Sequence, residues 1–269
     1  MNIKSNVLRM DLYRVVTSAW FYFSIVLVTV LCFSCNWTDI SQVFSQGNHN
    51  IDVTYIFTIL MGLGEFKNMI LIAAALACVG NFCSDWNHQF IRPVVIRCGA
   101  RKYSHSKIFS CLISTFLTVF IGLLLFVFLL SLRIPLHQEG SFSSSLVLNK
   151  PYDYLINGDF PILYFIVKIF ILSIACAFWG IVGLCVTSYI PNHFVAVASP
   201  FIAYYLLGEF GEYLPNFMNF RMLAYSYDVL GQGVVITVVY TILFFGVLSA
   251  LAGRLFTKNV QRRVSSEML

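Results

Sequence analysis

The sequence predicts an all-α polytopic membrane protein with six transmembrane helices. Of its 269 residues, 59% are hydrophobic and only 11% are charged, and the mean hydropathy is +0.81. Soluble domains carry about a quarter charged residues, so a water-soluble core does not account for this much apolar surface. The surplus must face lipid, and we expect one transmembrane domain over residues 1–269.

The length of the apolar runs gives the number of spans. A helix needs about 20 mostly apolar residues to cross the hydrocarbon core. Five runs meet this length, at residues 17–35, 66–84, 108–132, 161–188 and 233–256. A sixth span, 194–214, starts with fourteen apolar residues and reaches spanning length only by including Glu209 and Glu212. We therefore place both carboxylates near the outer rim.

The cations set the orientation. Twelve of the seventeen Lys and Arg residues fall on one face of the six-span arrangement: Lys4, Arg9, Arg14, Arg92, Arg97, Arg101, Lys102, Lys107, Arg254, Lys258, Arg262 and Arg263. The positive-inside rule makes that face cytoplasmic, and nine of the twelve acids lie on the other. Both termini are therefore predicted to be cytoplasmic, in a multi-pass membrane protein.

Residues 1–16 are predicted to form an amphipathic helix in the inner membrane interface. Apolar residues recur at helical spacing, at Ile3, Val7, Met10 and Val15, while Lys4, Asp11 and Arg14 are polar. Arg9 and Arg14 would anchor it at the headgroups, and a disordered tail is the alternative. The outer segments 36–65 and 133–160 are interpreted as long polar loops. The aromatic stretch before the last span is expected to form short helices that dip into the outer leaflet.

The sequence contains few motifs typical of catalysis or of nucleotide or metal binding. The sequence has no phosphate-binding GxxxxGK[ST] loop, no HExxH and no GxSxG, so we expect no catalytic residue, metal site or cofactor in the chain itself. Most cysteines are interpreted as small buried apolar residues, and a Cys32–Cys35 bridge is left open.

Charges and prolines inside spans mark candidate transport pathways. Lys168 lies inside the fourth span, where its stem is interpreted as reaching the outer interface, with a substrate-facing role as the alternative. Pro200 favours a kink in the fifth span. Together with Glu209 and Glu212, these are the candidate pathway residues.

The inner loop 85–107 is larger than a helix hairpin requires. Asp85 is placed at the N-terminus of a short helix, Pro93 is expected to kink it, and Gly99 to end it. Phe90, Ile91, Val94 and Val95 would form its apolar side, beside Arg92 and Arg97. Arg101, Lys102 and Lys107 would then anchor the next span at anionic headgroups. Such a helix suits docking to a cytosolic partner, and ordinary membrane anchoring is the alternative.

The order of these elements resembles the permease subunits of type-2 ABC exporters. Residues 99–107, GARKYSHSK, are similar to the run of Gly, Arg, Tyr and Lys residues by which that family enters its third span. The stretch ASPFIAYYLLGEFGEYLP, residues 198–215, looks like the fifth span and outer turn of Firmicute members. The resemblance implies a multi-pass protein of a bacterial plasma membrane.

The resemblance implies that residues 85–98 form a coupling helix, with Asp85, Phe90, Ile91, Arg92, Val94, Val95 and Arg97 facing a separate ATPase subunit. That partner would bind ATP and Mg²⁺, and a second permease copy or homologue would complete the path through the bilayer. The cargo would be a peptide or a hydrophobic cationic compound, and no nucleic acid is expected. A non-transporting scaffold or sensor subunit and an intramembrane enzyme are the alternatives.

Overall fold

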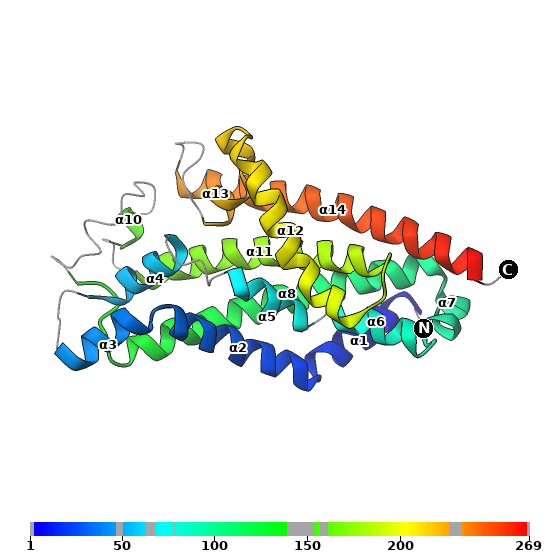
Figure 1. Cartoon of the computed structure of the whole chain (residues 1–269), viewed down its shortest axis with the longest axis horizontal. Helices are drawn as coiled ribbons and strands as arrows, with labels where there is room; N and C mark the ends of the chain where they lie inside the picture. Colours follow the sequence, from blue (N-terminus) through cyan, green and yellow to red (C-terminus); the bar gives the residue numbers. More distant parts are fainter. Residues whose placement is uncertain are drawn as a thin grey trace.

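The computed structural model describes residues 3–46, 51–62, 68–77, 79–138, 153–156, 161–225 and 233–267, and the regular structure in these ranges is helical. The helices run roughly along one long axis (Figure 1). We call the end that carries α7 (Ile91–Cys98) and both chain ends the inner end. The outer end carries α3 (Trp37–Gln46), α4 (Val53–Gly62) and α10 (Asp153–Ile156).

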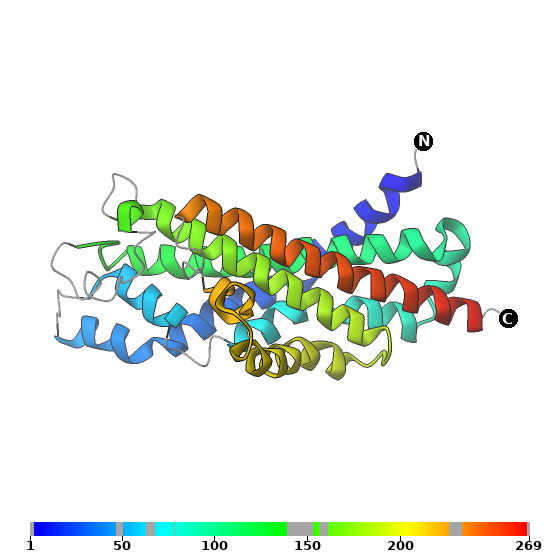
Figure 2. The same ribbon diagram turned by 90° about the horizontal axis from the view of Figure 1, so that it is seen from above.

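Four of the described helices are long and apolar enough to cross a membrane: α8 (Ala100–Ser131), α11 (Pro161–Thr187), α12 (His193–Glu212) and α14 (Val234–Glu267). Helix α11 packs against the other three and lies between them (Figure 2). An all-α membrane protein is thus confirmed at the level of its helices. Helix α8 begins eight residues before the predicted span, so the cations of residues 101–107 lie on its first two turns.

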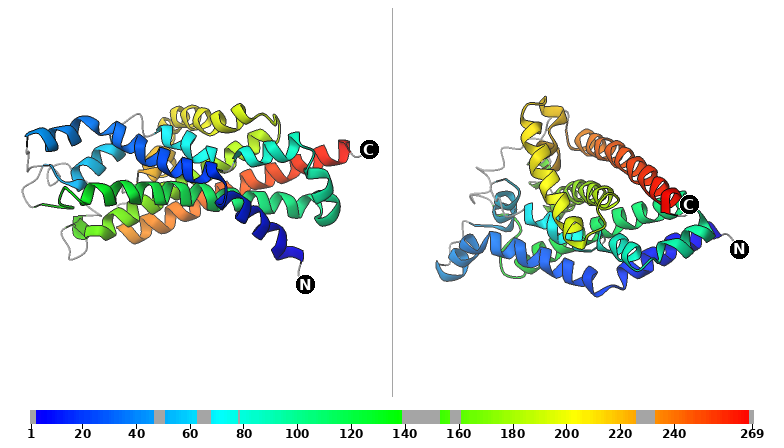
Figure 3. Two further views of the ribbon diagram at one scale, coloured as in Figure 1. Left: turned by 90° about the horizontal axis from the view of Figure 1, so that it is seen from below. Right: turned by 45° about the vertical axis from the view of Figure 1, so that its right-hand side comes forward.

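Two further pairs of helices reach spanning length only together. Helices α1 (Ile3–Val16) and α2 (Ala19–Cys35) are bent by 53° at their junction, where Ser18 Oγ accepts a hydrogen bond from the Trp20 amide. Helices α5 (Met69–Leu76) and α6 (Val79–Asn87) are bent by 42°. Counting each pair as one span gives up to six spans. Helix α1 leaves the direction of the bundle, as expected for a helix separate from the first span (Figure 3).

The buried and exposed faces of α1 differ from those of the predicted amphipathic helix. Met10 and Tyr13 are 46% and 71% exposed, whereas Asp11 and Val15 are buried against the protein. The prediction that Asp11 belongs to the solvated side is wrong, because Asp11 and Val15 are one helical turn apart and therefore share a face. An acid thus faces the protein interior at the inner end.

The corner between α6 and α8 contains the short helix predicted from the sequence, but it begins at Ile91 and not near Asp85. Asp85 lies in the last turn of α6. Gly99 ends α7 with φ +83°, a left-handed conformation that glycine adopts without steric cost. Pro93 was expected to kink the helix, but its position in α7 gives no cause for a kink. Pro93 sits in the first turn of α7, where its missing N–H removes no helical hydrogen bond.

The outer end is more helical than predicted. Helix α4 falls in a segment interpreted as polar loop, yet Ile56 and Phe57 are fully buried and the Phe57 ring packs edge-on against Phe165 of α11 at 5.2 Å. After α12, the 3₁₀ helix η3 (Asn216–Met218) and α13 (Phe220–Ala224) provide the short helices that were expected there. Residues 226–232 and most of 139–160 lie outside the described residues.

Three predictions about individual residues are refined, one at Pro200 and two at cysteines. Pro200 lies within α12, which continues through it, and Gly183 of α11 makes room for its ring: a Cβ at Gly183 would lie 2.6 Å from Pro200 Cγ. Cys32 and Cys35 carry free thiols. Cys111, expected to be a small apolar residue, is instead disulfide-bonded.

The orientation can be tested with a membrane-impermeant maleimide. Thr38→Cys on the outer end should react in intact cells, whereas Lys102→Cys and Arg262→Cys should react only after permeabilisation; all three side chains are exposed. The wild-type chain measures the background from native thiols. External labelling of Lys102→Cys in sealed cells would contradict cytoplasmic placement of the inner end.

Candidate functional site

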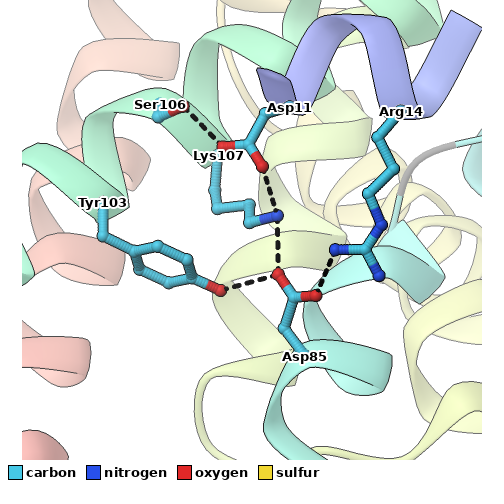
Figure 4. Close-up of polar contacts among 6 residues, drawn as sticks. All are labelled: Asp11, Arg14, Asp85, Tyr103, Ser106 and Lys107. Atoms are coloured by element: carbon cyan, nitrogen blue, oxygen red, sulfur yellow. Dashed lines mark hydrogen bonds and ion pairs between the residues drawn. The ribbon is translucent and has the colours of Figure 1, made fainter. Parts of the chain in front are cut away.

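A buried charge network joins three helices at the inner end (Figure 4). Lys107 Nζ of α8 lies 2.8 Å from Asp11 Oδ1 of α1 and 2.7 Å from Asp85 Oδ2 of α6. The side chains of Lys107, Asp11 and Asp85 are 7%, 4% and 1% exposed. Arg14 Nη1 donates to Asp85 Oδ1 at 2.6 Å from a position that is 42% exposed.

Two neutral donors complete this inner network. The Tyr103 hydroxyl donates to Asp85 Oδ2 at 3.1 Å, and Ser106 Oγ donates to Asp11 Oδ2 at 2.5 Å. Every carboxylate oxygen of Asp11 and Asp85 therefore accepts at least one hydrogen bond or ion pair. Two cations balance two carboxylates, which is the condition under which buried charges are tolerated.

Helical spacing brings these groups together. Asp11 and Arg14 are three residues apart on α1, and Tyr103 and Lys107 are four apart on α8, so each pair shares one helix face. Asp85 reaches the same point because α6 continues to Asn87 before the chain turns into α7. The prediction that Asp85 caps the short helix is therefore wrong. The anchoring role predicted for Lys107 is also wrong, because its ammonium is held inside the protein.

The short helix α7 is attached to the bundle by a different side from the one predicted. Ile91 and Val95 are 5% and 7% exposed and pack in one cluster with Phe82, Tyr103 and Phe256. Ile91, Val95 and Cys98 share a face at spacings of four and three residues, and burial raises the pKa of the Cys98 thiol, which stays a neutral packing group. Ile91 and Val95 are thus part of the core and are not available to a partner.

The outward side of α7 combines one large apolar residue with cations. Ile96 is 76% exposed, and Arg92 and Arg97 are exposed beside it. Phe90, just before the helix, is 44% exposed and lies under the Arg14 guanidinium, 5.7 Å from the ring centroid. Val94 is half-buried. Sequence reasoning missed Ile96, although its position opposite Ile91 and Val95 on a helix would have identified it.

The remaining predicted anchors lie at the surface. Arg9, Arg101 and Lys102 are exposed at the inner end, which is compatible with contact to headgroups.

The C-terminal part of α14 returns to this region. The Arg263 guanidinium lies 5.2 Å from the Trp86 ring centroid and donates to the Tyr189 carbonyl.

A second polar cluster lies toward the outer end. Lys168 is 4% exposed, and its Nζ donates to the Tyr225 carbonyl at 3.3 Å. The interpretation of Lys168 as a residue that reaches the outer interface is therefore wrong. The Tyr225 hydroxyl lies 2.7 Å from that of Tyr204 and also donates to Asn68 Oδ1 at 3.4 Å. Tyr204, Tyr225 and Asn68 line a small cavity of about 30 Å³ with Trp179, and Lys168 is not among its lining residues. The cavity has room for water and not for a cargo molecule.

Two other candidate pathway residues, Pro200 and Glu209, are also absent from the lining of that cavity. Pro200 packs on Gly183. Glu209 is 69% exposed and lies 3.3 Å from Arg221 Nη2, while the Arg221 guanidinium sits 5.9 Å from the Tyr204 ring. Arg221 and Tyr204 thus connect Glu209 to the Lys168 cluster. The side chain of Glu212 lies outside the described part of the structure.

The described residues contain no group of three or more His, Cys, Asp or Glu side chains placed to hold a metal ion. No family model, curated protein or solved structure matches the chain. The two polar clusters and the surface of α7 are therefore the features of this chain that indicate its function.

The inner network predicts a large effect of Lys107→Met. The substitution keeps the side-chain length but leaves two buried carboxylates adjacent without their shared cation, so we expect a loss of about 3–5 kcal/mol in unfolding free energy. An SDS titration in mixed micelles measures it. Lys102→Met, an exposed cation five residues earlier on α8, is the matched control and should change little.

A compensated variant separates electrostatics from packing. Adding Asp11→Asn and Asp85→Asn to Lys107→Met removes the unbalanced charges and should recover much of the lost stability. No recovery in the triple variant would mean that the network acts through packing and not through its charges.

Proposed function

We propose that this chain is the permease subunit of an ATP-binding cassette exporter. In this proposal it pairs with a second permease copy or homologue and with two cytosolic ATPase subunits that bind ATP and Mg²⁺. The observation that carries the proposal is α7, a short helix at the inner end that is fixed to the bundle on one side and presents Ile96, Arg92 and Arg97 on the other.

The way in which α7 is attached supports a role in transmitting motion. Its inward residues Ile91 and Val95 pack with residues of α6, α8 and α14. The inner network fastens the adjoining turns of α6 and α8 to α1 through Lys107. A displacement of α7 by a partner would therefore move these helices together, because well-packed and fully hydrogen-bonded elements shift as units.

In the transport step that we infer, ATP binding closes the ATPase pair and the two α7 helices follow. The paired permeases then open a path for the cargo, most simply toward the outside. A peptide or hydrophobic cationic cargo fits the excess of acids at the outer end. The six-span topology, with both termini inside, belongs to the same proposal.

The main rival is a non-transporting sensor or scaffold subunit. An ATPase partner distinguishes the two, because a sensor subunit needs none.

The docking surface can be tested with Ile96→Ser. Burial of one isoleucine side chain in a partner groove contributes about 1.5–3 kcal/mol, so the variant should lower affinity for an ATPase about tenfold to a hundredfold. The measurement is co-purification, in mild detergent, of a chain that carries a nucleotide-binding GxxxxGK[ST] motif. Ile190→Ser is the matched control, because Ile190 is 54% exposed in the connection from α11 to α12.

Three outcomes decide the matter. Loss of the ATPase with Ile96→Ser but not with Ile190→Ser supports docking through α7. Equal retention in both variants shows that α7 is only an anchor. If no ATPase accompanies the wild-type chain from its native membrane, the exporter proposal itself is wrong.

A further inference from the structure

An open groove runs between α8 and α14 from the middle of the bundle to its inner end. Its outer part has a volume of about 530 Å³ and its inner part about 460 Å³, and the two parts share Ile108, Phe109, Ser249 and Ala250 as lining residues. The groove is therefore continuous.

The chemistry of the groove changes along its length. The outer part is lined by apolar side chains such as Leu112, Phe116 and Ile242, which come from α8 and α14. The inner part is lined by Arg101 and His105 of α8 and by Arg254 of α14. The lining residues of both parts include no acid. An apolar slot thus leads into a cationic end without a countercharge from its own walls.

Small residues on α14 create the space. Gly246, Ala250 and Gly253 follow one another at helical spacing along the groove. At Gly253 the two helices touch, since a Cβ there would lie 3.2 Å from Ile108 Cδ1. At Gly246, by contrast, a Cβ would meet no atom within 4 Å. The groove is therefore widest in its apolar part.

We propose that this groove binds one anionic phospholipid of the inner leaflet, with an acyl chain along Phe109 and Gly246 and the phosphate between Arg101 and Arg254. Guanidinium groups are the preferred protein partners of phosphate, and inner-leaflet anionic headgroups lie at the level where basic residues gather. The proposal concerns a defined lipid site and does not depend on the exporter function.

Charge complementarity favours a lipid over a second copy of this chain. A second copy would have to bring an acid to Arg101 and Arg254 at the inner end. Of the three inner-end acids, Asp11 and Asp85 are 3% and 1% exposed and already paired with Lys107 and Arg14. Glu267 lies at the last residue of α14, thirteen residues beyond Arg254. A phospholipid supplies the negative charge and the apolar chain in one molecule.

The test is native mass spectrometry of the full-length, delipidated protein titrated with phosphatidylglycerol or phosphatidylcholine of identical acyl chains. The wild-type chain should bind one phosphatidylglycerol at least about tenfold more tightly than phosphatidylcholine, because two cations face the phosphate and its glycerol headgroup adds no positive charge. Arg101→Gln with Arg254→Gln should abolish this preference.

Two further variants separate the site from general attraction to the membrane. Gly246→Leu fills the apolar part without a backbone clash and should weaken binding of both lipids about tenfold. Arg262→Gln removes an exposed cation of α14 that does not line the groove, and it should leave the preference unchanged.

Several results would overturn the proposal. Equal affinity for both lipids in the wild type would do so, as would equal loss with Arg262→Gln and with the double variant. Competition by soluble glycerol phosphate as effective as that of the intact lipid would mean that the acyl chain is not held. A protein dimer that forms a crosslink between Ile113→Cys residues would assign the groove to a second copy.

Discussion

The arrangement of the inner end depends on the position of one ammonium group. Lys107 is buried, and burial of a charge is tolerated only with partners of opposite sign. Its two partners come from α1 and α6, which are separated in the sequence by more than seventy residues. The two ion pairs of Lys107 therefore hold α1 and α6 against α8 at the same time. The Tyr103 and Ser106 hydroxyls each donate to a carboxylate oxygen of the network, so few other arrangements would pair every oxygen of Asp11 and Asp85.

This constraint also determines what α7 can do. The helix follows the α6 turn that carries Asp85 and precedes the α8 turns that carry Tyr103 and Lys107. Both ends of α7 are thus held by the same charged groups, while Ile91 and Val95 hold its inward side. The outward side, with Ile96, is left as a rigid surface. A rigid surface loses little conformational entropy when it binds, which is an advantage for a docking element.

The sequence predicts the fold class well and the charged site poorly, for a physical reason. Apolar runs of spanning length and the glycine at position 99 act locally, so α7, α8 and α11 follow from the pattern. The role of a charge depends on its distant partners. In the sequence, Asp11 belongs to the polar side of an interfacial helix, Asp85 to the start of a short helix and Lys107 to the anchor of a span, and no local pattern joins the three. Helix α4 was missed because its apolar run is too short to span.

The two polar clusters differ in what a conformational change would cost. Separating Lys107 from Asp11 or Asp85 leaves buried charges without a partner of opposite sign, which strongly destabilises the folded state. In the outer cluster, the contacts of Tyr225 with Tyr204 and Asn68 are hydrogen bonds between neutral groups, which exchange with water at a modest net cost. The buried Lys168 ammonium also donates to the Tyr225 carbonyl and joins it to α11. A movement of α12 relative to α13 would exchange the neutral Tyr204–Tyr225 bond, whereas a movement of α13 relative to α11 would also break the Lys168 contact. The inner end is therefore suited to move as one body, and in the outer cluster the Tyr204–Tyr225 hydrogen bond is less costly to break than the contact of the buried ammonium.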